Sequence, residues 1–555
     1  MSGAERGRWW ISAAVGLLMA AAVAGPGGIG EQIPGYFNTD AAGALYLHDA
    51  FYRAISEGRW PGIDPDQLFP VGTPLWALNG GNSLEMALSA LLRPLLGWPA
   101  AYGASALLWI PLNLLAFLPL GRHLWGRTGP ALAAGAAWVI FPPTIGELAA
   151  GRLTQVVGVG LPLAVLGLLR ISERSRRGDL WLAAAGIALT GLGYWYYALF
   201  LVLLLPVFFL HGRAHRPAPR LAADLALAAL LGGLLAAPFA LPALLPHLGG
   251  AAPAPPIDPS RASPFFDNAL KVVGEQPRQL IGWLPLAWVG GALVTLAWGR
   301  RQGLWLAAGG LCVLFALGPA TRIGGGAFWL PYALLWQHVP LLDRLTHPGR
   351  WLGVGGLFLV VAASDGLARR WPAALWALPV AGLLQLWSGP NLPLGAWRLE
   401  LPAVWREAAA GQGALIVVPV LKSPLTCRWQ SQARRPLLGG MVEEQPWAWP
   451  AEFRAFVQDN TLLMDLWALG EGQDRAVNPY AADLATLREA GFTGVLLDME
   501  SWSRVPAARG VPVLERLSAA LGDPDFADPS GALWTLHPEG LAGEPPPSEF
   551  RLPVP

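Results

Sequence analysis

The sequence predicts a polytopic α-helical membrane protein of about eleven spans, followed by a C-terminal extracytoplasmic α/β domain. Of the 555 residues, 54% are hydrophobic and only 14% are charged, whereas soluble proteins carry about 25% charged residues. The apolar residues gather in runs long enough to cross about 30 Å of hydrocarbon. After about residue 388 these long runs give way to short strand-like and helical patterns.

Each predicted span is an apolar run of transmembrane length. The runs lie at residues 9–25, 99–121, 129–146, 153–171, 180–194, 196–211, 221–245, 281–298, 304–319, 351–368 and 371–387. We predict an interfacial or re-entrant helix, and no span, at residues 84–97. The first run also resembles a signal peptide, with Arg6 and Arg8 before it. We predict an uncleaved signal anchor, because the loop that follows must stay tethered to act at a membrane.

The loops between the runs alternate in charge, which predicts their orientation. If the N-terminus is cytoplasmic, every short inner loop is rich in arginine: Arg6, Arg8, Arg122, Arg127, Arg170, Arg174, Arg176, Arg177, Arg213, Arg216, Arg220, Arg300, Arg301, Arg369 and Arg370. The outer loops then hold most of the acidic residues. We therefore expect residues 26–83 and everything after about residue 388 to lie outside the cytoplasm, across a bacterial inner or plasma membrane.

The predicted domains are a membrane domain at residues 1–388, with an outer loop at 26–83, and a soluble domain at residues 389–555. Strand-like runs occur at residues 413–420, 491–498 and 532–536, with helical patterns at 451–469 and 480–490. The soluble domain shows no nucleotide-binding fingerprint and no metal-ligand spacing. Its Pro-rich end is expected to be poorly ordered. The two cysteines, Cys312 and Cys427, are too few for a disulfide framework and are expected to be free thiols.

A polar island at residues 35–76 follows the first apolar run. Acidic residues beside a bilayer are costly and tend to mark function. The island holds five of them: Asp40, Asp49, Glu57, Asp64 and Asp66. We interpret the apolar runs as a scaffold that holds this loop over a lipid-borne substrate.

Several motifs resemble the C-type glycosyltransferase superfamily, the multi-span enzymes that use polyprenyl-phosphate sugar donors. The resemblance begins with one span, an outer loop with an acid near its start, a helix, and then EGRWP and FPVGTPL. It continues in LRPLLGWPAAYGASALLWIPLNLLAFLPLGRHLWG, AAWVIFPPTIGELAAGRLTQVVGVGLPLAVLGLLR and THPGRWLGVGGLFLVVAASDGLARR, and covers most of residues 1–390. The resemblance implies inverting transfer of a hexose or pentose from polyprenyl phosphate to an extracytoplasmic glycan, lipid or protein.

The resemblance places the first-loop catalytic acid at Asp40. Inverting transfer needs a base that takes the proton of the acceptor hydroxyl. The alternative is that Asp40 only caps the helix predicted after it. Many members of the superfamily carry two adjacent acids here, whereas Asp40 stands between Thr39 and Ala41. A divalent metal therefore stays an open prediction, and no other cofactor is implied.

A second acid, Glu147, lies in FPPTIGELAAGR between two predicted spans, where the superfamily often has an acid. Glu147 is the second predicted catalytic residue, as a ligand of the acceptor or of a metal, and Arg152 is expected to bind the phosphate. The alternative is that the two residues form an interfacial ion pair. The aromatic cluster Tyr194–Tyr197 can belong to the belt at the headgroup level or stack on sugar rings.

His347 and Arg350 lie where a late outer loop meets the membrane, and arginine suits bidentate phosphate binding. The alternative for both is ordinary headgroup anchoring. His48 can line the cavity, although a lone histidine is usually structural. Asp49 is a weaker candidate, because it can simply pair with Arg53 at the i,i+4 spacing of a helix.

A second function class stays open: a non-catalytic membrane protein of the same architecture that handles or transports lipid-linked glycans. A transporter would be expected to carry charges in the middle of its spans or repeats of broken helices. Only Asp224 and Asp365 lie near span ends, which favours the enzyme. The net charge of +1, without a basic tail, gives no indication of nucleic-acid binding. The expected partners are the bilayer, the lipid-linked donor and the acceptor.

Overall fold

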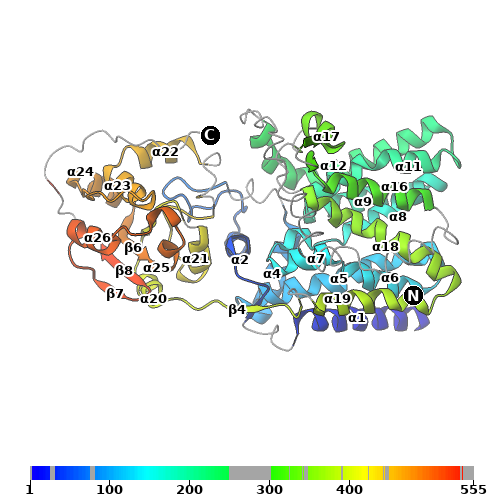
Figure 1. Cartoon of the computed structure of the whole chain (residues 1–555), viewed down its shortest axis with the longest axis horizontal. Helices are drawn as coiled ribbons and strands as arrows, with labels where there is room; N and C mark the ends of the chain where they lie inside the picture. Colours follow the sequence, from blue (N-terminus) through cyan, green and yellow to red (C-terminus); the bar gives the residue numbers. More distant parts are fainter. Residues whose placement is uncertain are drawn as a thin grey trace. The chain divides into compact units, whose positions relative to one another are not determined.

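The computed structural model describes residues 3–25, 32–74, 82–248, 302–323, 326–339, 342, 348–388, 392–422, 424–441, 443, 449–537 and 541 (Figure 1). The chain divides into two compact units. Unit 1 comprises Met1–Tyr36 and Gly80–Trp397, and unit 2 comprises Phe37–Asn79 and Arg398–Pro555. Each unit is therefore assembled from segments that are far apart in the sequence.

Unit 1 is a bundle of helices. Its helices are α1 (Gly3–Ala24), α4 (Leu84–Leu96), α5 (Ala100–Trp125), α6 (Thr128–Val139), α7 (Pro142–Ala149), α8 (Gly160–Glu173), α9 (Arg177–Gly193), α10 (Trp195–Leu203), α11 (Leu205–Gly212), α12 (Ala218–Leu248), α16 (Gln302–Ala316), α17 (Tyr332–His338), α18 (Trp351–Arg370) and α19 (Ala377–Ser388). Two small sheets accompany them: β1 (Gln32–Pro34) pairs with β4 (Ala396–Arg398), and β2 (Ala320–Ile323) pairs with β3 (Gly326–Trp329).

Five helical segments of the described residues are long and apolar enough to cross a membrane. They are Ala100–Trp125, Leu153–Glu173, Trp195–Gly212, Ala218–Leu241 and Pro348–Arg370. The protein is thus an integral membrane protein, although the structure does not bear out eleven full-length spans. The predicted runs at 9–25, 304–319 and 371–387 form shorter apolar helices, and the run at 281–298 lies outside the described residues.

The predicted span at residues 129–146 is a broken pair of helices. Helices α6 and α7 meet at a bend of 47°. They count as one membrane span only if the two helices together cross the membrane. The bend falls where Pro142 opens α7, because proline suits the first turn of a helix but cannot continue the hydrogen bonding of a preceding one. The break turns α7 into a separate short helix, on which Glu147 lies.

Helices α8 and α9 approach each other closely through glycines. A Cβ atom at Gly186 would lie 2.2 Å from the backbone nitrogen of Ala164, and one at Gly167 would lie 2.4 Å from that of Ala183. Both distances are far below van der Waals contact. Small residues allow this approach, which is the usual basis of helix association in membranes.

We expect Gly186→Val to destabilise unit 1 by about 1–3 kcal/mol, because the side chain overpacks the contact between α8 and α9. The midpoint of thermal unfolding in detergent measures the effect. Gly178→Ala is the matched control, since Gly178 lies on the same helix, is exposed, and has no described heavy atom within 4 Å of an added Cβ. Equal midpoints for Gly186→Val and the unchanged protein would contradict this packing.

The arginine-bearing loops of unit 1 come together at one end of its helices. At this end the Trp125 indole donates to Asp365 at 2.9 Å, and His123 Nε2 lies 3.7 Å from a Glu173 carboxylate oxygen. These contacts join the last turns of α5, α8 and α18. We call this the arginine-rich end, and it includes Arg122, Arg170 and Arg369.

Unit 2 contains a four-stranded mixed sheet in the order β5-β6-β8-β7. Strands β5 (Ala414–Val418) and β6 (Phe492–Asp498) are parallel, whereas β8 (Gly531–Thr535) is antiparallel to both β6 and β7 (Phe526–Asp528). The helices are α2 (Thr39–Ser56), α20 (Ala403–Ala410), α21 (Cys427–Ala433), α22 (Ala451–Gln458), α23 (Thr461–Gly470), α24 (Ala481–Glu489), α25 (Met499–Ser503) and α26 (Val513–Leu521).

The strand-like runs of the sequence correspond to β5, β6 and β8. The helical pattern at 451–469, however, forms two helices instead of one. Asn460 separates them, because its side chain accepts a hydrogen bond from the Leu463 backbone and so caps α23. Every residue of β5, which pairs with β6 in parallel, is buried. This is expected for parallel strands covered by helices.

Residues 37–76 of the polar island belong to unit 2. The division of the chain into two units therefore differs from a single boundary near residue 388. Leu68 is fully buried in the hydrophobic core that β5, β6 and their helices form. The Phe69 ring packs edge-on against Phe492 at 5.3 Å. Backbone hydrogen bonds join the island to the segment after α21: the amides of Leu68 and Phe69 donate to the carbonyls of Gly439 and Leu437. The island is therefore a structural part of the α/β fold.

Candidate functional site

Glu147 and Arg152 form an ion pair in unit 1, with the Arg152 guanidinium Nε donating to the Glu147 carboxylate. The sequence brings them together locally. Helix α7 ends at Ala149, Gly151 adopts a left-handed conformation with φ of 72°, and the Arg152 amide returns to donate to the Glu147 carbonyl at 2.9 Å. Both side chains are partly exposed, at 23% for Glu147 and 33% for Arg152, so solvent or a ligand reaches the pair.

Arg350 joins these two residues at the same end of unit 1. It lies just before α18, and its guanidinium carbon stands 5.8 Å from the ring centroid of Tyr194. The Tyr197 hydroxyl is within electrostatic range of Glu147, Arg350 and Arg152. The structure thus brings three of the residues predicted from the sequence into one cluster, which we call the Glu147 cluster.

The Glu147 cluster lies opposite the arginine-rich end. Arg350 precedes α18, whereas Arg369 lies in the last turn of the same helix. Likewise Arg152 precedes α8, and Arg170 lies in its last turn. The two ends of these helices therefore carry two separate groups of charged residues.

Packed aromatic rings support the cluster. Tyr197 packs edge-on against Tyr194 at 4.9 Å, and Phe200 stacks on Trp351 at 3.9 Å. A Cβ atom at Gly353 would lie 2.0 Å from the Tyr197 hydroxyl, so α10 and α18 meet only because residue 353 is glycine. Tyr194 and Tyr197 are buried at 5% and 4% exposure, so these two rings pack inside the protein instead of stacking on sugar rings.

Asn113 is a supporting residue that the sequence reasoning missed. Its amide nitrogen donates to the Val156 carbonyl at 2.8 Å, and its oxygen accepts from the Gly158 amide at 2.9 Å. These bonds hold the backbone that links the 3-10 turn Leu153–Gln155 to α8. A polar residue inside a predicted span was the available signal, because such residues are costly in a membrane and usually serve a purpose.

A small cavity of about 10 Å³ lies beside this backbone. Polar groups of Asn113, Gln155 and Tyr197 are among its lining. The Tyr197 hydroxyl also donates to the Gln155 carbonyl at 3.2 Å. A cavity of this size and polarity suits a single water molecule that completes such a network.

Asp40 lies in unit 2, exposed on the first turn of α2. The prediction that it could cap this helix is wrong. Asn38 is the N-cap, because its side-chain oxygen accepts from the Ala41 amide at 2.9 Å. Capping therefore does not explain why an acid stands at position 40, although its charge suits the positive end of the helix dipole.

The other four acids of the polar island have structural partners. Arg53 pairs with Asp49 at 3.0 Å and also with Asp66, as the i,i+4 spacing of Asp49 and Arg53 predicts. Glu57 pairs with the exposed Arg59.

Asp64 is bound by the Tyr46 hydroxyl, which donates to its carboxylate at 2.5 Å. Burial raises the pKa of the Asp64 carboxyl, although this hydrogen bond opposes the shift. These contacts hold the loop to α2 and give Asp64 a structural role.

His48 is buried in unit 2, at 1% exposure on α2. A role in substrate binding stays a prediction for it. His347 lies outside the described residues. The predicted base and the predicted phosphate ligands thus belong to different units, with Asp40 in unit 2 and Glu147, Arg152 and Arg350 in unit 1.

The described part of the chain contains no preformed site for the divalent metal that stays an open prediction. There, His, Cys, Asp and Glu side chains form no group of three or more that could hold a metal ion. Both cysteines are free thiols, as expected, and both are buried.

Comparison with known proteins gives similarity at the level of structure only. No family model and no curated protein matches the chain. The structure is similar to an oligosaccharyltransferase, AglB from Archaeoglobus fulgidus, solved with an inhibitory peptide and a dolichol-phosphate, with 11% identity and a TM-score of 0.45 over 100% of this chain and 76% of that one. It is also similar to ArnT from Cupriavidus metallidurans bound to undecaprenyl phosphate, with 12% identity and a TM-score of 0.44 over 95% and 97% of the two chains.

Proposed function

We propose that this protein is an integral membrane glycosyltransferase, which moves a sugar from a polyprenyl-phosphate donor to an extracytoplasmic glycan, lipid or protein with inversion. The observation that carries the proposal is the Glu147 cluster. It gathers two arginines and an acid at one end of the helices of unit 1, opposite the arginine-rich end. Paired arginines at a membrane surface suit a lipid-borne phosphate.

In the proposed reaction the acceptor oxygen attacks the anomeric carbon on the face opposite the phosphate. The bond from that carbon to the phosphate oxygen breaks, and its electron pair leaves with the lipid phosphate. Arg152 and Arg350 stabilise the negative charge that develops on this leaving group. Glu147 holds the Arg152 guanidinium in a fixed orientation through their ion pair.

Asp40 is the proposed base that takes the proton of the acceptor hydroxyl. Its exposure on the first turn of α2 leaves its carboxylate accessible to an acceptor. Asp49, Asp64 and Asp66 form contacts with Arg53 or Tyr46 that hold the loop to α2.

The orientation follows from the arginine-rich end, which the positive-inside rule assigns to the cytoplasm. The Glu147 cluster then lies at the extracytoplasmic surface, where the donor phosphate and the acceptor would meet. Unit 2 is proposed to lie on the same side of the membrane, because its segments follow the outer ends of the first and last predicted spans.

Transfer of labelled sugars tests the proposed function. The purified full chain is reconstituted with polyprenyl-phosphate sugars and extracted envelope acceptors, and products are identified by mass spectrometry. We expect labelled product and free polyprenyl phosphate in equal amounts, matched by lipid-linked and surface glycans that disappear from cells without the protein. Tight binding of the lipid phosphate without any transfer would instead identify a lipid-handling protein that is not an enzyme.

Cysteine labelling tests the topology. The native Cys312 and Cys427 are buried, so they give little background and cannot themselves report on orientation. We expect Ala519→Cys, at an exposed position of α26 in unit 2, to react with a membrane-impermeant maleimide on intact cells. Gly178→Cys, at the arginine-rich end, should react only after permeabilisation. The reverse pattern would overturn the orientation.

A further inference from the structure

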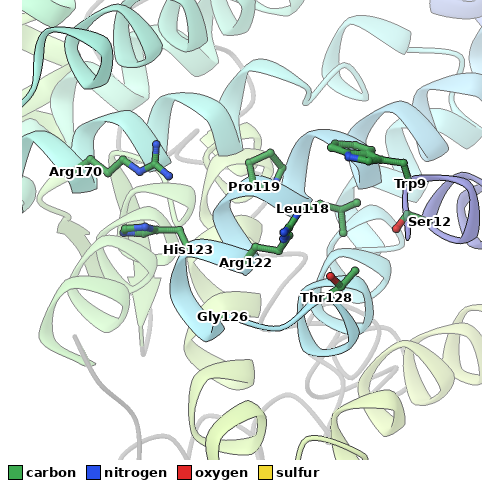
Figure 2. A pocket seen from close by; sticks show the side chains of 9 residues that line it. All are labelled: Trp9, Ser12, Leu118, Pro119, Arg122, His123, Gly126, Thr128 and Arg170. Carbon is green, nitrogen blue, oxygen red and sulfur yellow. The ribbon is translucent and has the colours of Figure 1, made fainter. Parts of the chain in front are cut away.

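A pocket of about 380 Å³ opens at the arginine-rich end of unit 1, remote from the Glu147 cluster (Figure 2). Helices α1, α5 and α8 and the turn before α6 form its walls. Figure 2 shows Arg170 and His123 on one side, Trp9 and Ser12 on the other, and Arg122 between them. The volume falls in the range of about 300–1,000 Å³ that is typical of small-molecule sites.

The lining of this pocket is basic. Arg122, His123 and Arg170 contribute to it, and no acidic side chain does. In the described part of the chain, the Arg122 side chain makes no ion pair or hydrogen bond. Arg170 reaches only a loose ion pair with Asp179, at 3.8 Å. Positive charge therefore gathers around an open space without close compensation by the protein.

Two nitrogen atoms of the lining are buried without a hydrogen-bond partner among the described residues: Nε of Arg170 and Nε2 of His123. His123 Nε2 stands 3.7 Å from Glu173, which is beyond hydrogen-bond distance, and Glu173 is also 3.7 Å from His211. Buried polar nitrogens of this kind are expensive to leave unpaired. An anion in the pocket would supply an acceptor for the accessible part of the Arg170 side chain, which is 28% exposed.

The apolar part of the lining indicates where the anion comes from. Trp9, Leu118 and Pro119 line the pocket beside the basic groups, at the ends of two apolar helices. The outer surface of α1 continues with exposed Trp10 and Leu18, at 76% and 68% exposure, which suits contact with lipid chains. A phosphate attached to an acyl chain can therefore enter the basic part while its chains stay along α1. Basic pockets at cytoplasmic helix ends bind anionic headgroups in this way.

We propose that this pocket binds the phosphate of an anionic phospholipid headgroup. Arg122 and Arg170 donate hydrogen bonds to the phosphate oxygens, as the guanidinium fork favours. Trp9 and Leu118 pack against the glycerol and the first methylene groups. The site is separate from the proposed transfer reaction and holds even if that reaction is absent. Bound lipid would tie α1 to α5 and α8, because all three helices line the pocket.

Native mass spectrometry of the full chain in detergent tests the proposal, with phosphatidylglycerol as the probe, phosphatidylcholine as the uncharged comparison and inorganic phosphate as a separate arm. We expect one phosphatidylglycerol to stay bound preferentially and to raise the thermal midpoint. Equal retention of phosphatidylcholine overturns the proposal. Stabilisation by inorganic phosphate without retention of phosphatidylglycerol overturns the lipid assignment.

Variants locate the site. Arg122→Gln with Arg170→Gln should lower phosphatidylglycerol affinity by at least about tenfold, because each removes a charged hydrogen bond. Arg127→Gln is the matched control, since Arg127 is exposed on the same turn but does not line the pocket, and it should bind as before. Thr128→Glu keeps both arginines and suits the first turn of α6, so it should fold normally and still repel the lipid. If phosphatidylglycerol affinity is unchanged both in Thr128→Glu and in the variant that combines Arg122→Gln with Arg170→Gln, the proposal is overturned.

Discussion

Asp40→Asn is expected to lower sugar transfer by roughly 10²–10⁴-fold, the usual contribution of a positioned acid or base, while the protein inserts and folds normally. Asparagine keeps the shape of the side chain but cannot accept a proton. The change also removes a favourable charge from the first turn of α2, worth about 0.3–1 kcal/mol, which is too little to unfold unit 2. Turnover with a labelled polyprenyl-phosphate sugar at saturating donor measures the effect.

Asn38→Ala is the matched control for Asp40→Asn. It removes the N-cap of α2, which costs about 1 kcal/mol of stability, but leaves the carboxylate in place. We therefore expect a lower thermal midpoint and nearly full activity at low temperature. If Asp40→Asn kept near wild-type turnover, Asp40 would leave the mechanism and Glu147 would become the next candidate for the base.

Arg152→Ala is expected to lower transfer by roughly 10²–10³-fold, the usual loss when one stabilising donor is removed from a developing negative charge. The donor KM should rise as well, because Arg152 would also contact the phosphate in the ground state. Arg152→Lys should recover only part of the rate, since a lysine keeps the charge and loses the planar fork. Initial rates over a range of donor concentrations separate the two effects.

Two comparisons make the Arg152 result specific. Glu147→Gln keeps a hydrogen-bond acceptor for Arg152 and should act mainly through the orientation of that arginine, so its effect should shrink in the Arg152→Ala background. Arg59→Ala removes an exposed ion pair with Glu57 and should leave transfer unchanged. Additive losses from Glu147→Gln and Arg152→Ala would show that the two residues act independently.

The periodic features of this chain were predictable because they are local. Apolar runs such as Ala100–Trp125 and Pro348–Arg370 have the length that a membrane span requires. The strands β5, β6 and β8 are visible in the sequence as short β-branched or apolar runs. Interruptions were harder to place. The sequence predicts one span at 129–146 and one helix at 451–469, whereas Pro142 and Asn460 begin new helices inside them.

The candidate site was predictable where its geometry is local. Glu147 and Arg152 pair across one turn, so sequence spacing alone indicated their contact. Arg350 comes from a distant segment, and its position beside Tyr194 depends on the close passage of Gly353 past Tyr197, which no pattern reveals. The cap at Asn38 and the partners of Asp64 were missed because each depends on a side-chain orientation.

The interleaving of residues 37–79 with the C-terminal segment fixes the order in which the protein can be made. Gln67 hydrogen-bonds to Gln430, which follows it by 363 residues, at 3.1 Å. At about 5–20 residues per second, the ribosome needs roughly 20–70 s to supply this partner. Until then α2 and its loop lack the C-terminal residues that complete their core. The proposed base is thus assembled last, and a chain stopped near residue 388 would insert its helices but never complete the surface that carries Asp40.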